Sequence, residues 1–100
     1  MSWHFLPDVS GPGTFNLGDL ANDNGYQQPT LFRAIQLVAT GAGTARLGEP
    51  STVSATRGLP IIASGGSQFL PYVGEQTLNQ LGALEVYIPS GCTLSIGWEY

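Results

Sequence analysis

The fold is decided by the stretch Cys92-Thr93-Leu94-Ser95-Ile96-Gly97-Trp98-Glu99-Tyr100, in which apolar and polar residues alternate. A period of two places Cys92, Leu94, Ile96 and Trp98 on one face of a strand and leaves small or polar residues on the other. This pattern is typical of an antiparallel strand with one buried face. The inward phase also predicts that Cys92 is a small buried filler rather than a reactive thiol.

The same kind of pattern extends back to Leu31, with glycine, proline and serine marking the breaks between short segments. Strands are expected over residues 31–39, 44–48, 51–57, 59–63, 67–72, 75–78, 83–88 and 92–100. Turn signals about every eight to ten residues indicate an all-β protein, a single antiparallel β-sandwich that is jelly-roll-like or a small barrel. No segment predicts a helix, and a short turn near Thr77 to Leu81 comes nearest to one.

Three details of strand pairing follow from this pattern. Residues 84–88 and 92–100, joined by Pro89-Ser90-Gly91, are expected to form a hairpin whose inner faces carry Leu84, Val86 and Ile88 against Leu94, Ile96 and Trp98. The segment 40–43 is expected to be another hairpin turn, because it lacks the spacing, lysine and following helix of a phosphate-binding loop. Pro60 and Pro71 cannot donate to a ladder, so their strands are expected to lie at sheet edges or to begin at a proline.

Residues 1–30 have a different character, with turn chemistry at 10–13, 22–25 and 27–29 and no sustained period. Large apolar side chains such as Trp3, Phe5, Phe15 and Tyr26 are nevertheless interspersed there. We therefore expect an extended N-terminal arm over residues 1–30, which buries its aromatic groups on its own sandwich or on a neighbouring subunit. Residues 31–100 form the β-sandwich domain in this interpretation.

Composition limits the possible functions. Charged residues make up 10% of the chain, lysine is absent, and the formal net charge is −4. Three arginines without a basic run cannot build a phosphate-tracking groove, so direct nucleic-acid binding is not expected. Nor does any apolar run match a membrane span or a signal peptide, so no membrane partner is expected.

Catalytic and metal chemistry have few candidates, so no enzyme activity and no cofactor are predicted. His4 is the single histidine and is expected to be an interface or surface residue. Asp19, Asp23 and the neighbouring asparagines offer oxygen ligands, but Leu20 interrupts a calcium-loop pattern and an Asx-type turn is preferred. Carbohydrate stacking on Tyr72, Tyr87 or Trp98 stays open, with Tyr87 phased outward and Trp98 assigned to the core.

Two segments carry a resemblance to a known family. Thr56-Arg57-Gly58-Leu59-Pro60-Ile61-Ile62-Ala63-Ser64-Gly65-Gly66 and the later segment 81–96 resemble the C-terminal half of small accessory virion proteins of tailed bacteriophages. In that family an R-G-x-P-L-x-x-G segment precedes a final hairpin of the form L-x-x-L-x-V-x-x-x-S-G-x-x-L-x-I. The likeness covers about 45 of the 100 residues and does not extend to the first 30.

The resemblance implies a structural virion protein that decorates and cements a phage capsid, made in the cytoplasm of a host bacterium and located on the capsid surface. Its implied partners are the major capsid protein and copies of itself, as a trimer or a dimer. The interface residues we predict are Trp3, Phe5, Phe15, Tyr26, Tyr87 and Tyr100. The alternative is a carbohydrate-binding or host-surface-binding module of a phage particle, with Tyr87 as its contact residue.

Overall fold

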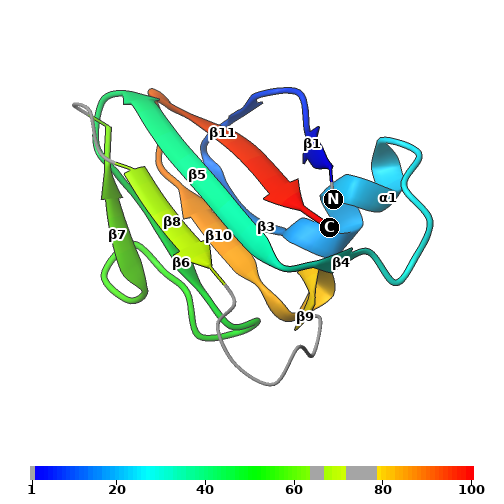
Figure 1. The fold of residues 1–100 in the computed structure, drawn as a ribbon. Coiled ribbons are helices and arrows are strands. Elements are labelled where there is room, and N and C mark those ends of the chain that lie inside the picture. Colours follow the sequence, from blue (N-terminus) through cyan, green and yellow to red (C-terminus); the bar gives the residue numbers. More distant parts are fainter. Residues whose placement is uncertain (1, 64–66, 72–78) are drawn as a thin grey trace.

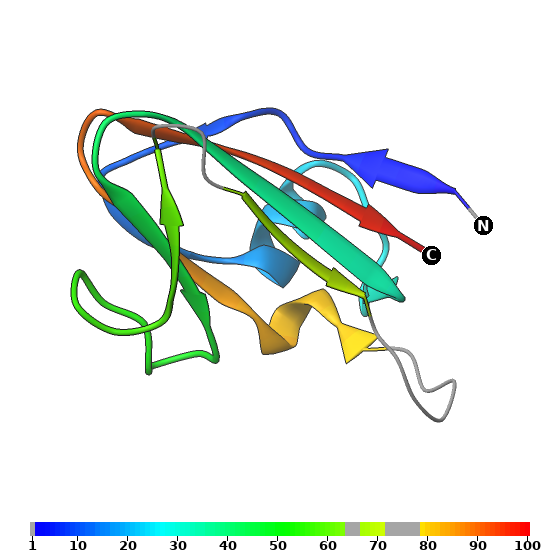
Figure 2. The same cartoon turned by 60° about the vertical axis from the view of Figure 1, so that its left-hand side comes forward.

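Two antiparallel sheets face each other in the computed structural model, which describes residues 2–63, 67–71 and 79–100 (Figure 1). The first sheet has the order β1-β11-β5-β8, with β2 also paired to β11, and the second has the order β3-β10-β6-β7. Strands β4 and β9 form a third sheet of two strands. Turning the molecule separates the two layers, with β5 and β11 in one and β6 and β10 in the other (Figure 2). The all-β sandwich predicted from the alternation is confirmed.

The elements have the following bounds: β1 Trp3–Phe5, β2 Val9–Ser10, β3 Gly13–Asn16, α1 Leu17–Asp23, β4 Leu31–Phe32, β5 Ala34–Gly41, β6 Thr44–Gly48, β7 Leu59–Ile62, β8 Ser67–Pro71, β9 Asn79–Gln80, the 3₁₀ turn η1 Leu81–Ala83, β10 Glu85–Ile88 and β11 Cys92–Glu99.

The strand order is that of a jelly roll. If β1 and β2 count as one strand, the first strand pairs with the last, β3 pairs with β10, β5 with β8, and β6 with β7. Two further pairings, β11 with β5 and β10 with β6, join these pairs into the two sheets. A long antiparallel ribbon folded over on itself gives this arrangement, which is the double-sheet form of the jelly roll.

The core lies between the sheets and is built from the inward positions of each strand. On β11 the residues Cys92, Leu94, Ile96 and Trp98 are each at most 1% exposed, as the alternation predicts. The neighbouring strand β5 and the facing sheet contribute further fully or almost fully buried side chains, namely Ile35, Leu37, Ala39, Ala45, Leu47, Ile61, Val86 and Ile88. Burial of these apolar surfaces is the main favourable term for the fold.

The predicted hairpin of residues 84–88 and 92–100 is wrong. Strand β10 pairs with β3 and β6 in the second sheet, whereas β11 pairs with β1, β2 and β5 in the first. The connection at 89–91 therefore crosses between sheets, and the inner residues Val86 and Ile88 share the core with Leu94 and Ile96 across the sandwich. The alternation of apolar and polar residues shows which face of a strand is buried. The pattern is the same whether two strands pair side by side in one sheet or pack face to face from different sheets.

The segment 40–43 is also a sheet crossing rather than a hairpin turn, because β5 belongs to the first sheet and β6 to the second. It meets the 89–91 crossing at one end of the sandwich, where the Ala42 N–H donates to the Gly91 carbonyl at 3.0 Å. The β2–β3 turn joins them, since the Gly11 N–H donates to the Cys92 carbonyl, also at 3.0 Å. Glycine permits these close backbone contacts, and we call this end the glycine end.

Residues 2–30 are part of the sandwich rather than a separate arm. Strands β1 and β2 extend the first sheet beside β11, and β3 extends the second beside β10. Leu6, Leu17 and Ala21 are buried in the common core. The expected boundary at residue 30 therefore does not separate two units, since each sheet takes strands from both sides of it.

Helix α1 is a further correction, since no helix was expected. The Asn16 side-chain oxygen accepts a hydrogen bond from the Asp19 N–H at 3.1 Å, which caps the first turn. Leu17 and Ala21 lie one turn apart and are fully buried. The segment 22–25 ends this helix instead of forming an isolated Asx turn, with the Asn24 side chain donating to the Leu20 carbonyl at 2.8 Å. Seven residues that include glycine, asparagine and aspartate have weak helix propensity, so packing and caps decide the outcome.

The strand expected over 31–39 is divided at Arg33 into β4 and β5, and the strand expected over 51–57 is a run of turns with an isolated bridge between Ser54 and Arg57. Hydroxyl groups compete with a ladder there, because Thr52 Oγ1 donates to the Glu49 carbonyl at 2.6 Å. The predicted strand 75–78 lies outside the described residues. Of the predicted turn from Thr77 to Leu81, residues 79–81 are described, and they form strand β9 and the start of the 3₁₀ turn η1.

The prolines occupy sheet edges, as predicted, since β7 and β8 each stand last in their strand order. The Ala63 N–H donates to the Gly43 carbonyl at 2.9 Å. Since hydrogen-bonded pairs alternate along an antiparallel ladder, the hydrogen-bonded pairs of β6 and β7 are Ala45 with Ile61 and Leu47 with Leu59. Pro60 lies opposite Arg46 in the intervening pair, in which the backbone N–H positions point away from the partner strand. The N–H that proline lacks would therefore not have bonded to β6. A proline at such a position also hinders pairing with another chain.

The glycine end gives a matched test of packing. Gly41 and Gly91 have φ values of 93° and 83°, which disfavour any other residue. An added Cβ at Gly41 would also overlap the Gly91 carbonyl oxygen, whereas one at Gly91 has nothing within 4 Å. We expect Gly91→Ala to lower the free energy of unfolding by about 1 kcal/mol and Gly41→Ala by about 3 kcal/mol, measured by urea denaturation. Equal losses would contradict the proposed contact.

Candidate interaction surface

Two large aromatic rings project from the outer face of the first sheet. Trp3 and Phe5 lie two residues apart on β1, so both point away from the core, and their ring centroids are 6.3 Å apart with an interplanar angle of 18°. Trp3 is 38% exposed and Phe5 is 68% exposed. Exposed stacked rings of this size favour contact with another molecule. We call Trp3 and Phe5 the aromatic ridge.

Gly97 allows the ridge to lie close to the sheet. It pairs with Phe5 across the β1–β11 ladder, and a Cβ built at Gly97 would be 2.7 Å from Cδ1 and Cε1 of the Phe5 ring. Any side chain at this position would therefore push the ring outward. Gly97 thus has a packing role on the outer face of a strand whose inner face is in the core.

A shallow hollow of about 340 Å³ adjoins the ridge. Its lining comes from β1, β5, β11 and the segment after β1, and consists of Phe5, Leu6, Asp8, Gln36, Val38, Ser95, Ile96 and Gly97. Asp8 is the one charged side chain in this lining, and its Oδ1 accepts a hydrogen bond from Ser95 Oγ at 2.9 Å. The surface formed by the ridge and the hollow is therefore largely uncharged.

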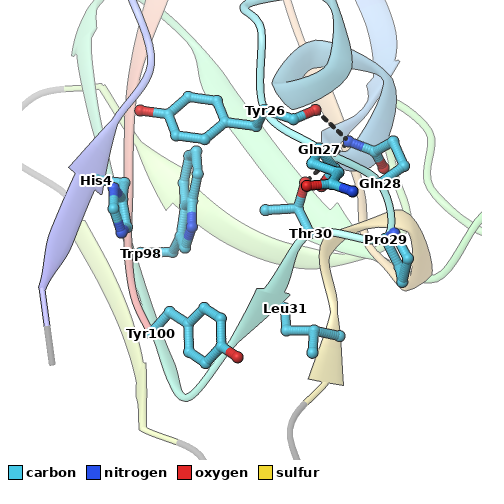
Figure 3. Close-up of a pocket in the computed structure, with 9 residues that line it drawn as sticks. All are labelled: His4, Tyr26, Gln27, Gln28, Pro29, Thr30, Leu31, Trp98 and Tyr100. Atoms are coloured by element: carbon cyan, nitrogen blue, oxygen red, sulfur yellow. Dashed lines mark hydrogen bonds between the residues drawn. The ribbon is translucent and has the colours of Figure 1, made fainter.

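On the opposite side of β1, aromatic side chains gather around Trp98. The Tyr26 ring meets Trp98 edge to face at 4.9 Å, and His4 lies 5.8 Å from Trp98 between ring centroids. Figure 3 shows these rings on one side of a pocket and the segment 27–31 on the other. The pocket has a volume of about 450 Å³ and is lined by His4, Tyr26, Gln27, Gln28, Pro29, Thr30, Leu31, Trp98 and Tyr100. We call it the aromatic pocket.

The structure brings together four of the six residues predicted for an interface. Trp3, Phe5, Tyr26 and Tyr100 all lie around the paired strands β1 and β11, with the first two on the ridge and the others at the pocket.

The other two predicted residues lie on the second sheet. Phe15 on β3 pairs with the buried Val86 and packs against the core, with its ring over Gly13, so its apolar surface is used within this chain. Tyr87 on β10 is half-buried and pairs with Arg46 and Thr14. Of the stacking candidates, Trp98 is in the core as predicted, and Tyr72 lies outside the described residues.

Sequence reasoning missed the parts of this surface that depend on three-dimensional pairing. His4 packs on Trp98 because β1 lies beside β11, which places the two residues opposite each other. The three-residue alternation of Trp3, His4 and Phe5 was the available signal, but it is too short to be recognised as a strand. Residues 27–30, which form most of the other wall of the pocket, gave no periodic signal.

Metal-ligating side chains do not gather in the part of the chain that the structure describes. Within residues 2–63, 67–71 and 79–100, no three His, Cys, Asp or Glu side chains are placed to hold a metal ion together. The ring of His4 packs against the rings of Tyr26 and Trp98. Likewise, none of the described helices is long and apolar enough to cross a bilayer.

Comparison with known proteins found no similarity on which to rely, since no family model matches the chain and no curated protein or solved structure is significantly similar to it. The assignment of the fold therefore rests on the strand pairing itself.

Cys92 gives a test of the core at high pH. The thiol is buried at the start of β11, and burial raises its pKa because the thiolate would lose its hydration. The folded state therefore holds the proton more tightly than the unfolded chain, so stability is fully present below about pH 8.5 and falls as pH rises through the raised pKa. We expect native protein to lose more stability than Cys92→Ala between pH 7 and pH 10 in urea titrations. A parallel decline of the two proteins would disprove the burial effect.

Gly97→Ala tests the contact beneath the ridge. The methyl group should displace the Phe5 ring and disturb its stacking on Trp3, while the free energy of unfolding falls by no more than about 1 kcal/mol because Phe5 is mostly exposed. Near-ultraviolet circular dichroism reports the aromatic change. Gly82→Ala is the control, since a Cβ there meets nothing within 4 Å. An unchanged aromatic spectrum for Gly97→Ala would show that the ring does not rest on this residue.

Proposed function

We propose that this chain is a structural protein of a tailed-phage particle, which decorates the capsid and stabilises it by bridging neighbouring subunits of the major capsid protein. Contact, rather than chemistry, is its mode of action. The observation that carries the proposal is the aromatic ridge of Trp3 and Phe5, exposed on the outer face of the first sheet.

The ridge has the properties of an interface centre. Aromatic residues are enriched at the core of protein interfaces, and charged residues are depleted there. Phe5 presents most of its ring to solvent, and the adjoining hollow contains a single charged side chain, Asp8. A partner that covers this face would bury apolar surface and remove few charges from water, which makes association favourable.

The fold suits a role in which the protein must keep its shape under mechanical stress. Each strand in the middle of a sheet is paired along both edges, and the core fills the space between the layers. The prolines at β7 and β8 hinder uncontrolled pairing along those edges. A partner is then selected by side chains on a rigid face, which limits the entropy lost on binding. The resemblance of residues 56–66 and 81–96 to accessory virion proteins supports the same function.

Phe5→Ser tests this proposal. Shells of the phage that carries the gene, prepared without this protein, are mixed with purified native or variant protein and analysed by cosedimentation and electron microscopy. We expect native protein to bind the shells and Phe5→Ser to bind at least about tenfold more weakly, because the loss of a large exposed ring from an interface centre costs more than about 1.4 kcal/mol.

Ile62→Ser is the matched control, since Ile62 is 54% exposed but lies on β7 in the second sheet. It should bind like the native protein. Light scattering of the free protein determines whether the bridging unit is a monomer, dimer or trimer. Failure of native protein to bind shells, or normal binding by Phe5→Ser, would overturn the proposal.

Carbohydrate binding is the second candidate, and the aromatic pocket is the observation that favours it. That pocket is on the other side of β1 from the ridge, so the two candidate functions use different side chains.

A further inference from the structure

The aromatic pocket combines ring surfaces with neutral polar groups, and its volume of about 450 Å³ is within the range of about 300–1,000 Å³ typical of small-molecule sites. We propose that it binds a neutral sugar ring at the surface of the particle. The site differs from the Tyr87 position considered from the sequence, because Tyr87 lies on β10 in the second sheet.

One wall of the pocket is aromatic. Trp98 forms a fixed base, being 1% exposed and held between the core and the rings of Tyr26 and His4. Tyr100 is 51% exposed, and its hydroxyl group points across the pocket toward Leu31 (Figure 3). The C–H face of a sugar ring packs on an aromatic ring of this kind, and the phenol group adds a hydrogen-bonding partner beside it.

The opposite wall supplies carboxamides. Gln27 and Gln28 are both exposed at the pocket. The Gln28 Nε2 group donates to Thr30 Oγ1 at 2.8 Å and to the Tyr26 carbonyl at 3.3 Å, and its Oε1 takes no part in these bonds. A carboxamide offers both donors and acceptors, and a sugar hydroxyl group requires both.

This wall is already fixed without a ligand. Thr30 Oγ1 donates to the Gln27 carbonyl at 3.2 Å, and the Thr30 carbonyl accepts from the Leu81 N–H at 2.8 Å. The segment is also tied to α1, because the Tyr26 N–H donates to the Ala21 carbonyl at 3.0 Å. A preformed wall reduces the ordering cost of binding.

The charge of the lining decides the ligand class. None of the nine lining residues is Asp, Glu, Lys or Arg, and the one basic side chain among them, His4, packs its ring against Tyr26 and Trp98. The lining therefore holds no permanently charged side chain to pair with a phosphate, carboxylate or amine. A proline-rich peptide also packs on aromatic grooves. Its backbone carbonyls can accept hydrogen bonds, but its proline residues have no N–H group to donate one. The acceptor oxygens of Gln27 and Gln28 would stay unpaired against such a peptide, which favours a sugar.

The experiment uses the full chain and a panel of neutral sugars, namely methyl glycosides of glucose, galactose, mannose and N-acetylglucosamine together with their short oligomers. Saturation-transfer NMR detects binding, and titration gives dissociation constants. We expect at least one of these sugars to bind, and Tyr100→Ala and Gln27→Ala each to weaken it about tenfold, in line with loss of one ring contact or one well-placed polar group. Tyr87→Ala is the control, matched in residue type, and should bind like the native protein.

Thermal melting of each variant checks that the fold is retained, and Gln27→Ala serves as the test if Tyr100→Ala melts early. The inference is wrong if no neutral sugar on the panel binds, if both pocket variants bind as tightly as the native protein, or if a proline-rich peptide binds the pocket instead. Phe5→Ser should keep full sugar affinity, so this result is independent of the shell-binding test.

Discussion

The pairing of β11 on both of its edges is the constraint on which the rest of the structure depends. One edge binds β1 and β2, the other binds the whole length of β5, and the Ser2 and Tyr100 backbones exchange two hydrogen bonds of 3.1 Å at its end. Because side chains alternate along this strand, its eight residues contribute to the core on one face and support the aromatic ridge on the other. A shift of register by one residue would exchange these two faces and destroy both.

The sequence contained enough information to predict the strands and their buried faces, since the alternation at residues 92–98 and 84–88 reports directly which side chains avoid water. It did not contain the partner of each strand. A short connection such as 89–91 is compatible with a hairpin or with a crossing between sheets, and the choice depends on which other strands occupy the edges of β10 and β11. Two of those strands, β1 and β3, are short and lie far away in the chain. Tertiary pairing rather than local preference makes them strands, and the same holds for helix α1.

The candidate sites were predictable in composition but not in arrangement. The aromatic residues near the N-terminus were conspicuous because a solvated segment has no need of them. Their division between ridge, pocket and core depends on the register of β1 and β3, which places Phe5 over Gly97 but turns Phe15 toward Val86. The pocket needed in addition a wall from residues 27–31, whose shape depends on hydrogen bonds between side chains and backbone that no periodic pattern reveals.

The two ends of the sandwich differ in how freely evolution can remodel them. At the glycine end the crossings at 11–13, 41–43 and 89–91 interlock through their backbones, so lengthening one of them would force the others apart. The connections at the opposite end, such as 24–30 and 49–58, are longer and more exposed. Sequence differences among homologues should therefore accumulate at that end while the glycine end stays nearly invariant.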